Sequence, residues 1–128
     1  MTRRYAILAP EQFASRSAKT AHGMIAYGSD EVVAVIDPLH AGRSVREVVP
    51  YLKSDAPLVA TLDEAQRFAP TTLLIGVAPP GGALPQSWRA TIVRALEAGL
   101  EVASGLHEIL AEDYEFARAA ARGDGRIW

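Results

Sequence analysis

The sequence contains no cysteine, and this absence excludes several kinds of site at once. Without thiols the chain has no disulfide framework, no thiolate metal ligand and no cysteine nucleophile. No apolar stretch is long enough to cross a bilayer, and the first residues lack the apolar core of a signal peptide. We therefore expect a cytoplasmic protein with no membrane partner.

Lysine is scarce as well, since the sequence contains two lysines, Lys19 and Lys53, and eleven arginines. The net charge of −2 gives no electrostatic support for binding nucleic acid. The three histidines share no metal-ligand spacing, so we expect no metal site. Two of them, His22 and His40, are placed in loops and given no special role. What remains is a globular composition, 49% hydrophobic and 22% charged over 128 residues, which suits one domain with its own core.

The most informative stretch is TTLLIGVAPPGG, residues 71–82. Its apolar run at 73–77 is typical of a strand in the middle of a parallel sheet that helices cover on both faces. Prolines then end the strand, Gly81 and Gly82 permit a positive φ, and Pro85 is expected as the first residue of a helix. A glycine loop before a helix N-terminus presents backbone N–H groups to an anion. We therefore predict that Gly81 and Gly82 bind one.

Apolar runs alternate with helical patterns along the rest of the chain. The spacing of Ser44 with Glu47, and of Thr61 with Glu64, predicts capping boxes at two helix starts. Strands that alternate with helices indicate right-handed βαβ units. The prediction is a Rossmann-like α/β fold, a doubly wound parallel sheet of five to six strands in three αβα layers. The expected strands cover residues 4–9, 32–36, 58–60, 73–77 and 100–103, with a sixth beginning at 126.

Two helices are predicted in the second half of the chain. Over residues 85–98, Trp88, Ile92 and Leu96 fall on one face, and Gly99 follows as the closing residue. Asp113 is expected to cap a last helix that carries Phe116, Ala117 and Ala120 and ends at residues 123–125. Trp88 and Tyr114 are both assigned to the core.

Ligands of a doubly wound sheet bind at the carboxyl ends of its strands where the strand order reverses, commonly between the first and fourth strands. The loop after the first expected strand lacks GxGxxG, which argues against a dehydrogenase with a standard dinucleotide site. Asp37, at the end of the second strand, either contacts a cofactor ribose or simply ends the strand in an Asp-Pro turn. Arg43 either meets a cofactor anion at the same edge or lies solvated on the surface.

Further candidates lie beside this expected crevice. Lys19 and Thr20 offer an ammonium and a hydroxyl to a substrate carboxylate or phosphate, or else form a solvated helix start. His107 follows the fifth strand, close to Ser104. It is either a general base or substrate ligand, or a residue that bonds the backbone near a helix N-terminus.

Five segments together resemble one family. They are SAKTAHG (17–23), VVAVIDPLHAGR (32–43), TLLIGVAPPGGALPQSWR (72–89), EAGLEVASGLHEIL (97–110) and GRIW (125–128). In this order they are similar to the N-terminal domain of the DgcN-type D-glutamate N-acetyltransferases, a family long catalogued as a domain of unknown function. The resemblance implies a Rossmann-like domain followed by a P-loop NTPase-like domain. We therefore expect residues 1–128 to be a fragment of a two-domain protein.

The resemblance also implies an activity, the transfer of an acetyl group from acetyl-CoA to the amine of D-glutamate or a similar D-amino acid. Acetyl-CoA is then a co-substrate, no cofactor is tightly bound, any nucleotide belongs to the second domain, and a homo-oligomer is expected. Under this hypothesis Lys19, Thr20 and Ser104 bind substrate, Gly81 and Gly82 cradle an anion or oxyanion, and His107 is the base or an orienting group. The alternative is a noncatalytic Rossmann-like module that binds a nucleotide, CoA or a neighbouring domain.

Overall fold

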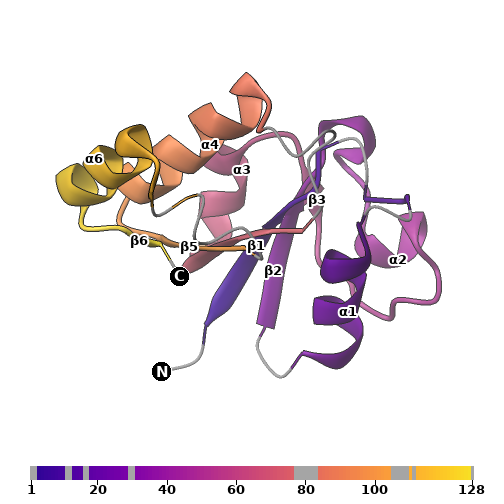
Figure 1. The fold of residues 1–128 in the computed structure, drawn as a ribbon. Helices are drawn as coiled ribbons and strands as arrows, with labels where there is room; N and C mark the ends of the chain where they lie inside the picture. The colour runs from indigo at the N-terminus through magenta and orange to yellow at the C-terminus, as the bar shows by residue number, and fades with distance from the viewer. Residues whose placement is uncertain are drawn as a thin grey trace.

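A computed structural model describes residues 3–10, 13–15, 18–28, 31–76, 84–104, 110 and 112–127. Six strands form one sheet in the order β3-β2-β1-β4-β5-β6, and every neighbouring pair is parallel (Figure 1). This arrangement confirms the predicted Rossmann-like, doubly wound sheet. The strands are β1 (Arg4–Leu8), β2 (Glu31–Ile36), β3 (Leu58–Val59), β4 (Thr72–Ile75), β5 (Glu101–Ala103) and β6 (Arg126–Ile127).

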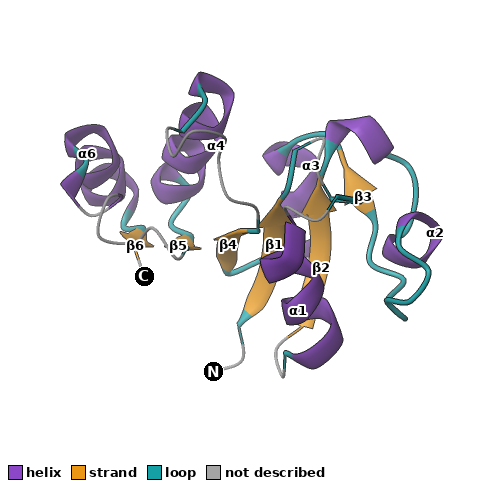
Figure 2. Ribbon diagram, turned by 45° about the vertical axis from the view of Figure 1, so that its right-hand side comes forward, coloured by secondary structure: helices purple, strands orange, loops and turns teal. Residues whose placement is uncertain are grey.

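Helices cover both faces of the sheet, because right-handed crossovers place them on one face from β1 to β3 and on the other from β4 to β6, where the chain moves in the opposite direction. Figure 2 shows α1 and α2 on one side, and α3, α4 and α6 on the other. These α-helices are α1 (Lys19–Tyr27), α2 (Val45–Val48), α3 (Leu62–Ala65), α4 (Gln86–Glu97) and α6 (Tyr114–Gly123), with short 3₁₀ helices η2 (Pro38–His40) and η3 (Gln66–Phe68).

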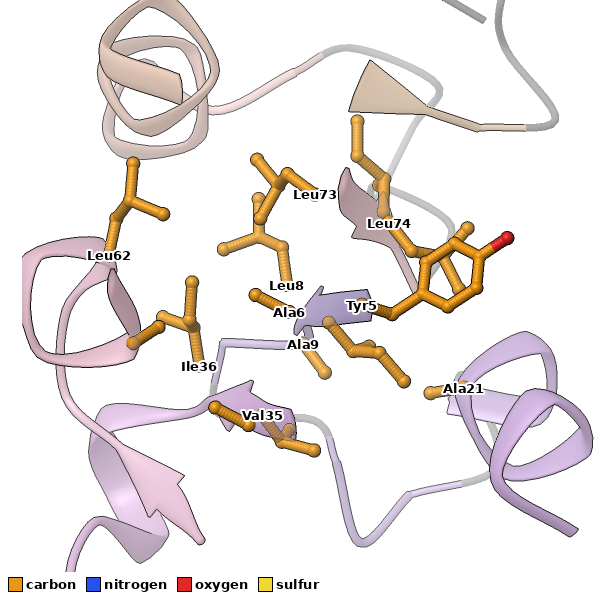
Figure 3. Close-up of a cluster of buried hydrophobic side chains, with 14 of the residues drawn as sticks. Tyr5, Ala6, Leu8, Ala9, Ala21, Val35, Ile36, Leu62, Leu73 and Leu74 are labelled. Atoms are coloured by element: carbon orange, nitrogen blue, oxygen red, sulfur yellow. The ribbon is translucent and has the colours of Figure 1, made fainter. Parts of the chain in front are cut away.

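The core lies between the sheet and these two helical layers. On the α3 side, Leu8 and Leu73 lie close to Leu62, whereas Tyr5 and Leu74 lie toward α1 (Figure 3). All five side chains are buried. The register explains the separation, because side chains on a strand alternate between faces and Tyr5 pairs with Thr72, one residue before Leu73.

The predicted cap signals are formed at three of the helix starts. Ser44 and Glu47 make a complete capping box at α2. At α3 the Thr61 hydroxyl accepts from the N–H of Glu64 at 3.2 Å, but the Glu64 carboxylate reaches the N–H of Ala60, so only half of the predicted box forms. Asp113 caps α6 as predicted. The cap of α4 is Pro85, so this helix begins one residue later than expected.

One of the two aromatic core assignments is wrong. Trp88 is 5% exposed and belongs to the core as predicted, but Tyr114 is 75% exposed. Phe116 and Ala119 define the buried face of α6, and Tyr114 at the start of this helix points away from it. Within the described residues, none of the helices is long and apolar enough to cross a membrane.

Candidate functional site

The strand order reverses between β1 and β4, as predicted. Leu8 at the end of β1 pairs with Ile75 at the end of β4, and the two strands then have different outer neighbours, β2 and β5. Ala21 of α1 donates its N–H to the carbonyl of Gly76 at 3.3 Å. This bond holds the first half of α1 against the end of β4. The start of α1 therefore lies at the position where doubly wound folds bind their ligands.

Lys19 and Thr20 are the first two residues of α1, and both are exposed. No side chain of the described residues caps this helix start. Ser104 directly follows β5 and is half-buried. Lys19 and Thr20 thus have the accessibility that a substrate contact requires.

The remaining candidates of this edge, Gly81, Gly82 and His107, lie outside the described residues. Their convergence with Lys19 stays a prediction. The same holds for the double-glycine bend as an anion site.

Asp37 caps the 3₁₀ helix that follows β2. Its side chain is 0% exposed, and it accepts from the N–H of Leu39 at 3.1 Å and contacts Nδ1 of His40 at 2.8 Å. Asp37 therefore ends the strand in a turn, as the Asp-Pro pair suggested. A contact between this buried, bonded carboxylate and a cofactor stays a prediction. His40, which was predicted to lie in a loop and was given no special role, lies in η2 and is bound to Asp37.

Arg43 is exposed and follows Gly42, which adopts φ +94°. The side chain is thus accessible in the segment between η2 and α2, where it can either be solvated or contact an anion. Its proposed role toward a cofactor remains a prediction.

A pocket of about 630 Å³ lies along one flank of α1, between that helix and residues 51–53. Both lysines of the chain, Lys19 and Lys53, line it, together with His22, Tyr27 and Tyr51. Figure 1 shows α1 and α2 on this side of the fold. Sequence analysis assigned Lys53 no role, because only the tertiary structure brings it to the same pocket as Lys19.

His22 fixes the position of Tyr51 across this pocket. Nε2 of His22 lies 2.6 Å from the carbonyl oxygen of Phe13, and Nδ1 lies 2.8 Å from the hydroxyl of Tyr51. Because a carbonyl only accepts, Nε2 carries a proton, and in the neutral ring Nδ1 then accepts from Tyr51. The His22 ring also makes edge contacts with both aromatic rings, at centroid distances of 5.2 Å to Phe13 and 5.9 Å to Tyr51.

The prediction that His22 lies in a loop was therefore wrong. The residue belongs to α1 and joins the loop after β1 to the segment after α2. Among the residues that the structure describes, no group of His, Asp and Glu could hold a metal ion. The side chains that line the pocket include two ammonium groups, an imidazole and two phenols.

Comparisons with known proteins agree with this fold. Residues 38–128 match a family described as a domain of unknown function (DUF1611_N), a Rossmann-like domain. The chain is also similar to the crystal structure of a DUF1611 family protein from Anabaena variabilis, with a TM-score of 0.89 and 33% identity. That match covers 99% of this chain and 36% of the other.

A curated relative carries a functional name. It is a D-glutamate N-acetyltransferase from Tritonibacter scottomollicae, 46% identical over 66 residues, a match that covers 52% of this chain and 20% of the relative. The chain therefore spans about a fifth of that relative's length and somewhat more than a third of the solved chain. From the family match over residues 38–128, supported by the close structural likeness, the chain belongs to the DUF1611_N family of Rossmann-like domains.

Proposed function

We propose that this chain is the N-terminal ligand-binding domain of an amino-acid N-acetyltransferase. The observation that carries the proposal is the 46% identity over 66 residues to a protein named D-glutamate N-acetyltransferase. The reaction would move an acetyl group from acetyl-CoA to the amine of D-glutamate or a similar D-amino acid. Because the match covers 20% of that relative, the active protein would be longer. From the family resemblance we further propose a P-loop domain after this one and a homo-oligomeric protein.

Acetyl transfer to an amine sets clear chemical requirements. The ammonium group loses a proton, and the neutral nitrogen attacks the thioester carbonyl to form the C–N bond. The nitrogen then gives up a second proton, and the C–S bond breaks as CoA leaves and takes up a proton as its thiol. Negative charge develops on the carbonyl oxygen in between, and backbone N–H groups can stabilise it. In our proposal His107 takes the proton from the amine, and the amides of Gly81 and Gly82 face the oxyanion.

The carboxylates of the amino acid need cations and hydroxyl donors. We assign this role to Lys19 and Thr20, which are exposed at the reversal point of the sheet, and to Ser104 after β5. Arg43 would bind a phosphate of acetyl-CoA, and Asp37, directly after β2, would contact its ribose. Acetyl-CoA would act as a co-substrate, and the domain would hold no tightly bound cofactor.

The test uses the protein from the complete reading frame, with release of the CoA thiol as the readout and mass spectrometry to identify N-acetyl-D-glutamate. Losing one charge-assisted contact costs about 1.5–3 kcal/mol, so Lys19→Ala should raise KM for the amino acid by about 10- to 100-fold. His107→Ala should lower kcat by about 10²- to 10⁴-fold. Arg118→Ala, an exposed change on α6, is the control. Absence of acetylation of any D-amino acid refutes the activity, and unchanged kinetics in both variants refutes the site.

A second candidate is a noncatalytic module that binds a nucleotide or CoA, or docks a neighbouring domain. It is favoured by the small share of the relatives that the chain spans, 20% and 36%, which leaves room for the chemistry elsewhere. Thermal shifts of this chain with acetyl-CoA, D-glutamate, ATP and NAD separate the two candidates. Stabilisation by a nucleotide alone favours the module, whereas stabilisation by the amino acid favours a substrate site.

A further inference from the structure

We propose that the pocket between α1 and residues 51–53 binds an anion that carries a planar ring, a ligand of the chemical type and size of a mononucleotide. Its volume of about 630 Å³ falls within the range of small-molecule sites. None of the described residues that line it belongs to a strand. Apart from Lys19, none of the described lining residues is assigned to acetyl transfer, so the pocket goes beyond that function.

The charge of the pocket is the first reason to expect an anionic ligand. Lys19 and Lys53 both line it, and none of its described lining residues is acidic. Neither ammonium has a hydrogen-bond or ion-pair partner within the described part of the chain. Most described arginines behave differently: Arg3, Arg4, Arg46, Arg89, Arg94 and Arg122 each pair with a carboxylate. Two unpaired cations on one concave surface favour an anionic ligand.

Gly23 is the second reason to expect a ligand in this pocket. It lies inside α1 and lines the pocket, and a Cβ added to it would meet nothing within 4 Å. By contrast, a Cβ on Gly76 would press on Ile7 and Ala21, and Gly42 and Gly99 have a positive φ. Glycine inside a helix costs stability relative to alanine. Neither packing nor backbone geometry among the described residues accounts for this cost at Gly23, whereas a ligand close to the helix backbone does.

The exposed tyrosines are the reason to expect a planar ring in the ligand. Tyr27 is 91% exposed and Tyr51 is 68% exposed, and both line the pocket. The bond from Tyr51 to Nδ1 of His22 at 2.8 Å, with the edge contact of the two rings, holds the Tyr51 ring in place. A ring that is already fixed loses little conformational freedom when a planar ligand stacks on it. Phosphate near the lysines and a base on a tyrosine would satisfy both features.

The inference shares Lys19 with the proposed acetyltransferase site, so its test uses Lys53, Gly23 and Tyr51, which that proposal does not use. The probe is AMP, titrated into the complete protein by calorimetry, with adenosine and inorganic phosphate as its separated halves. We expect AMP to bind more tightly than either half, because the lysines recognise one part and the tyrosines the other.

Each variant has its own expected effect on AMP binding, and one variant serves as a control. Lys53→Ala should weaken AMP binding by about tenfold or more, and Tyr51→Ala by about 5- to 100-fold. Gly23→Leu should abolish binding by filling the pocket, with the fold checked by circular dichroism. Arg118→Ala makes the same charge change as Lys53→Ala on the other face of the sheet and should leave binding intact.

Three results would overturn the inference. They are no AMP binding at millimolar concentration, unaltered AMP binding by folded Lys53→Ala and Gly23→Leu proteins, or phosphate binding as tight as that of AMP. None of these results bears on acetyl transfer, which is measured separately.

Discussion

Arg89 of α4 binds the carboxylate of Asp113, the residue that caps α6. One guanidinium nitrogen lies 2.9 Å from Oδ2 of Asp113 and 2.9 Å from Oε1 of Glu115, and the group stands 4.5 Å over the ring of Phe116. The hydrogen bond to Asp113 is the main cause that raises the pKa of Arg89 above its ordinary value. Asp113 also accepts from the N–H of Phe116 at 3.2 Å. The same carboxylate thus starts α6 and fastens it to α4.

Asp113→Ala should lower the free energy of unfolding by about 1–3 kcal/mol, because it removes the helix cap and one ion pair together. Urea denaturation measures the change. Glu115→Ala is the matched control, since it removes an ion pair from the same arginine and leaves the cap, and it should cost less than about 1 kcal/mol. Equal losses in the two variants would contradict the role of Asp113 as the cap.

Gly76→Ala and Gly23→Ala should change stability in opposite directions. A Cβ on Gly76 would lie 2.5 Å from Cγ2 of Ile7 and 2.9 Å from Cβ of Ala21, so overpacking should cost about 1–3 kcal/mol. A Cβ on Gly23 meets nothing within 4 Å, so alanine should stabilise the helix by about 0.5–1 kcal/mol. Thermal unfolding of both variants checks the pair. Destabilisation by Gly23→Ala would show that the helix interior at this position is more crowded than the structure has it.

Local signals in the sequence were sufficient to predict most of the fold. Caps and apolar spacing act within a few residues, so Ser44, Asp113 and the buried face of α4 could be predicted. Tyr114 could not be placed from its aromatic type, because burial depends on the helix face that Phe116 establishes.

The candidate site depends on contacts between residues that are far apart in the sequence. His22 and Tyr51 are 29 residues apart, and no local pattern connects them. The strand reversal between β1 and β4 was predicted from the usual strand order of such folds and is confirmed. Lys19 is the first residue of α1. The roles of the site residues remain predictions, because they depend on a ligand and on groups outside the described residues.

The stabilising effect of Glu47 should depend on pH. Its carboxylate accepts from the N–H of Ser44 at 2.9 Å, and this backbone bond is the main cause that lowers the pKa of Glu47 from its ordinary value of 4.5. A lowered pKa means that the stabilisation is complete above the ordinary value and is lost as the pH falls through the lowered one. The stability difference between the natural protein and Glu47→Gln should therefore shrink as the pH falls from about 7 towards 3. Urea denaturation across this range measures it, and a constant difference would contradict the capping role.

The tautomer of His22 can be observed directly. Because the Phe13 carbonyl lies 2.6 Å from Nε2, the neutral ring should carry its proton on Nε2 and accept from Tyr51 at Nδ1. Two-bond ¹H–¹⁵N correlation spectra above neutral pH distinguish the two tautomers. Tyr51→Phe keeps the ring contact and removes only the hydroxyl, so it should leave the Nε2–H tautomer in place and cost about 1 kcal/mol of stability. A proton on Nδ1 would reverse the direction of the Tyr51 bond, and the ring would then be held through its acceptor oxygen.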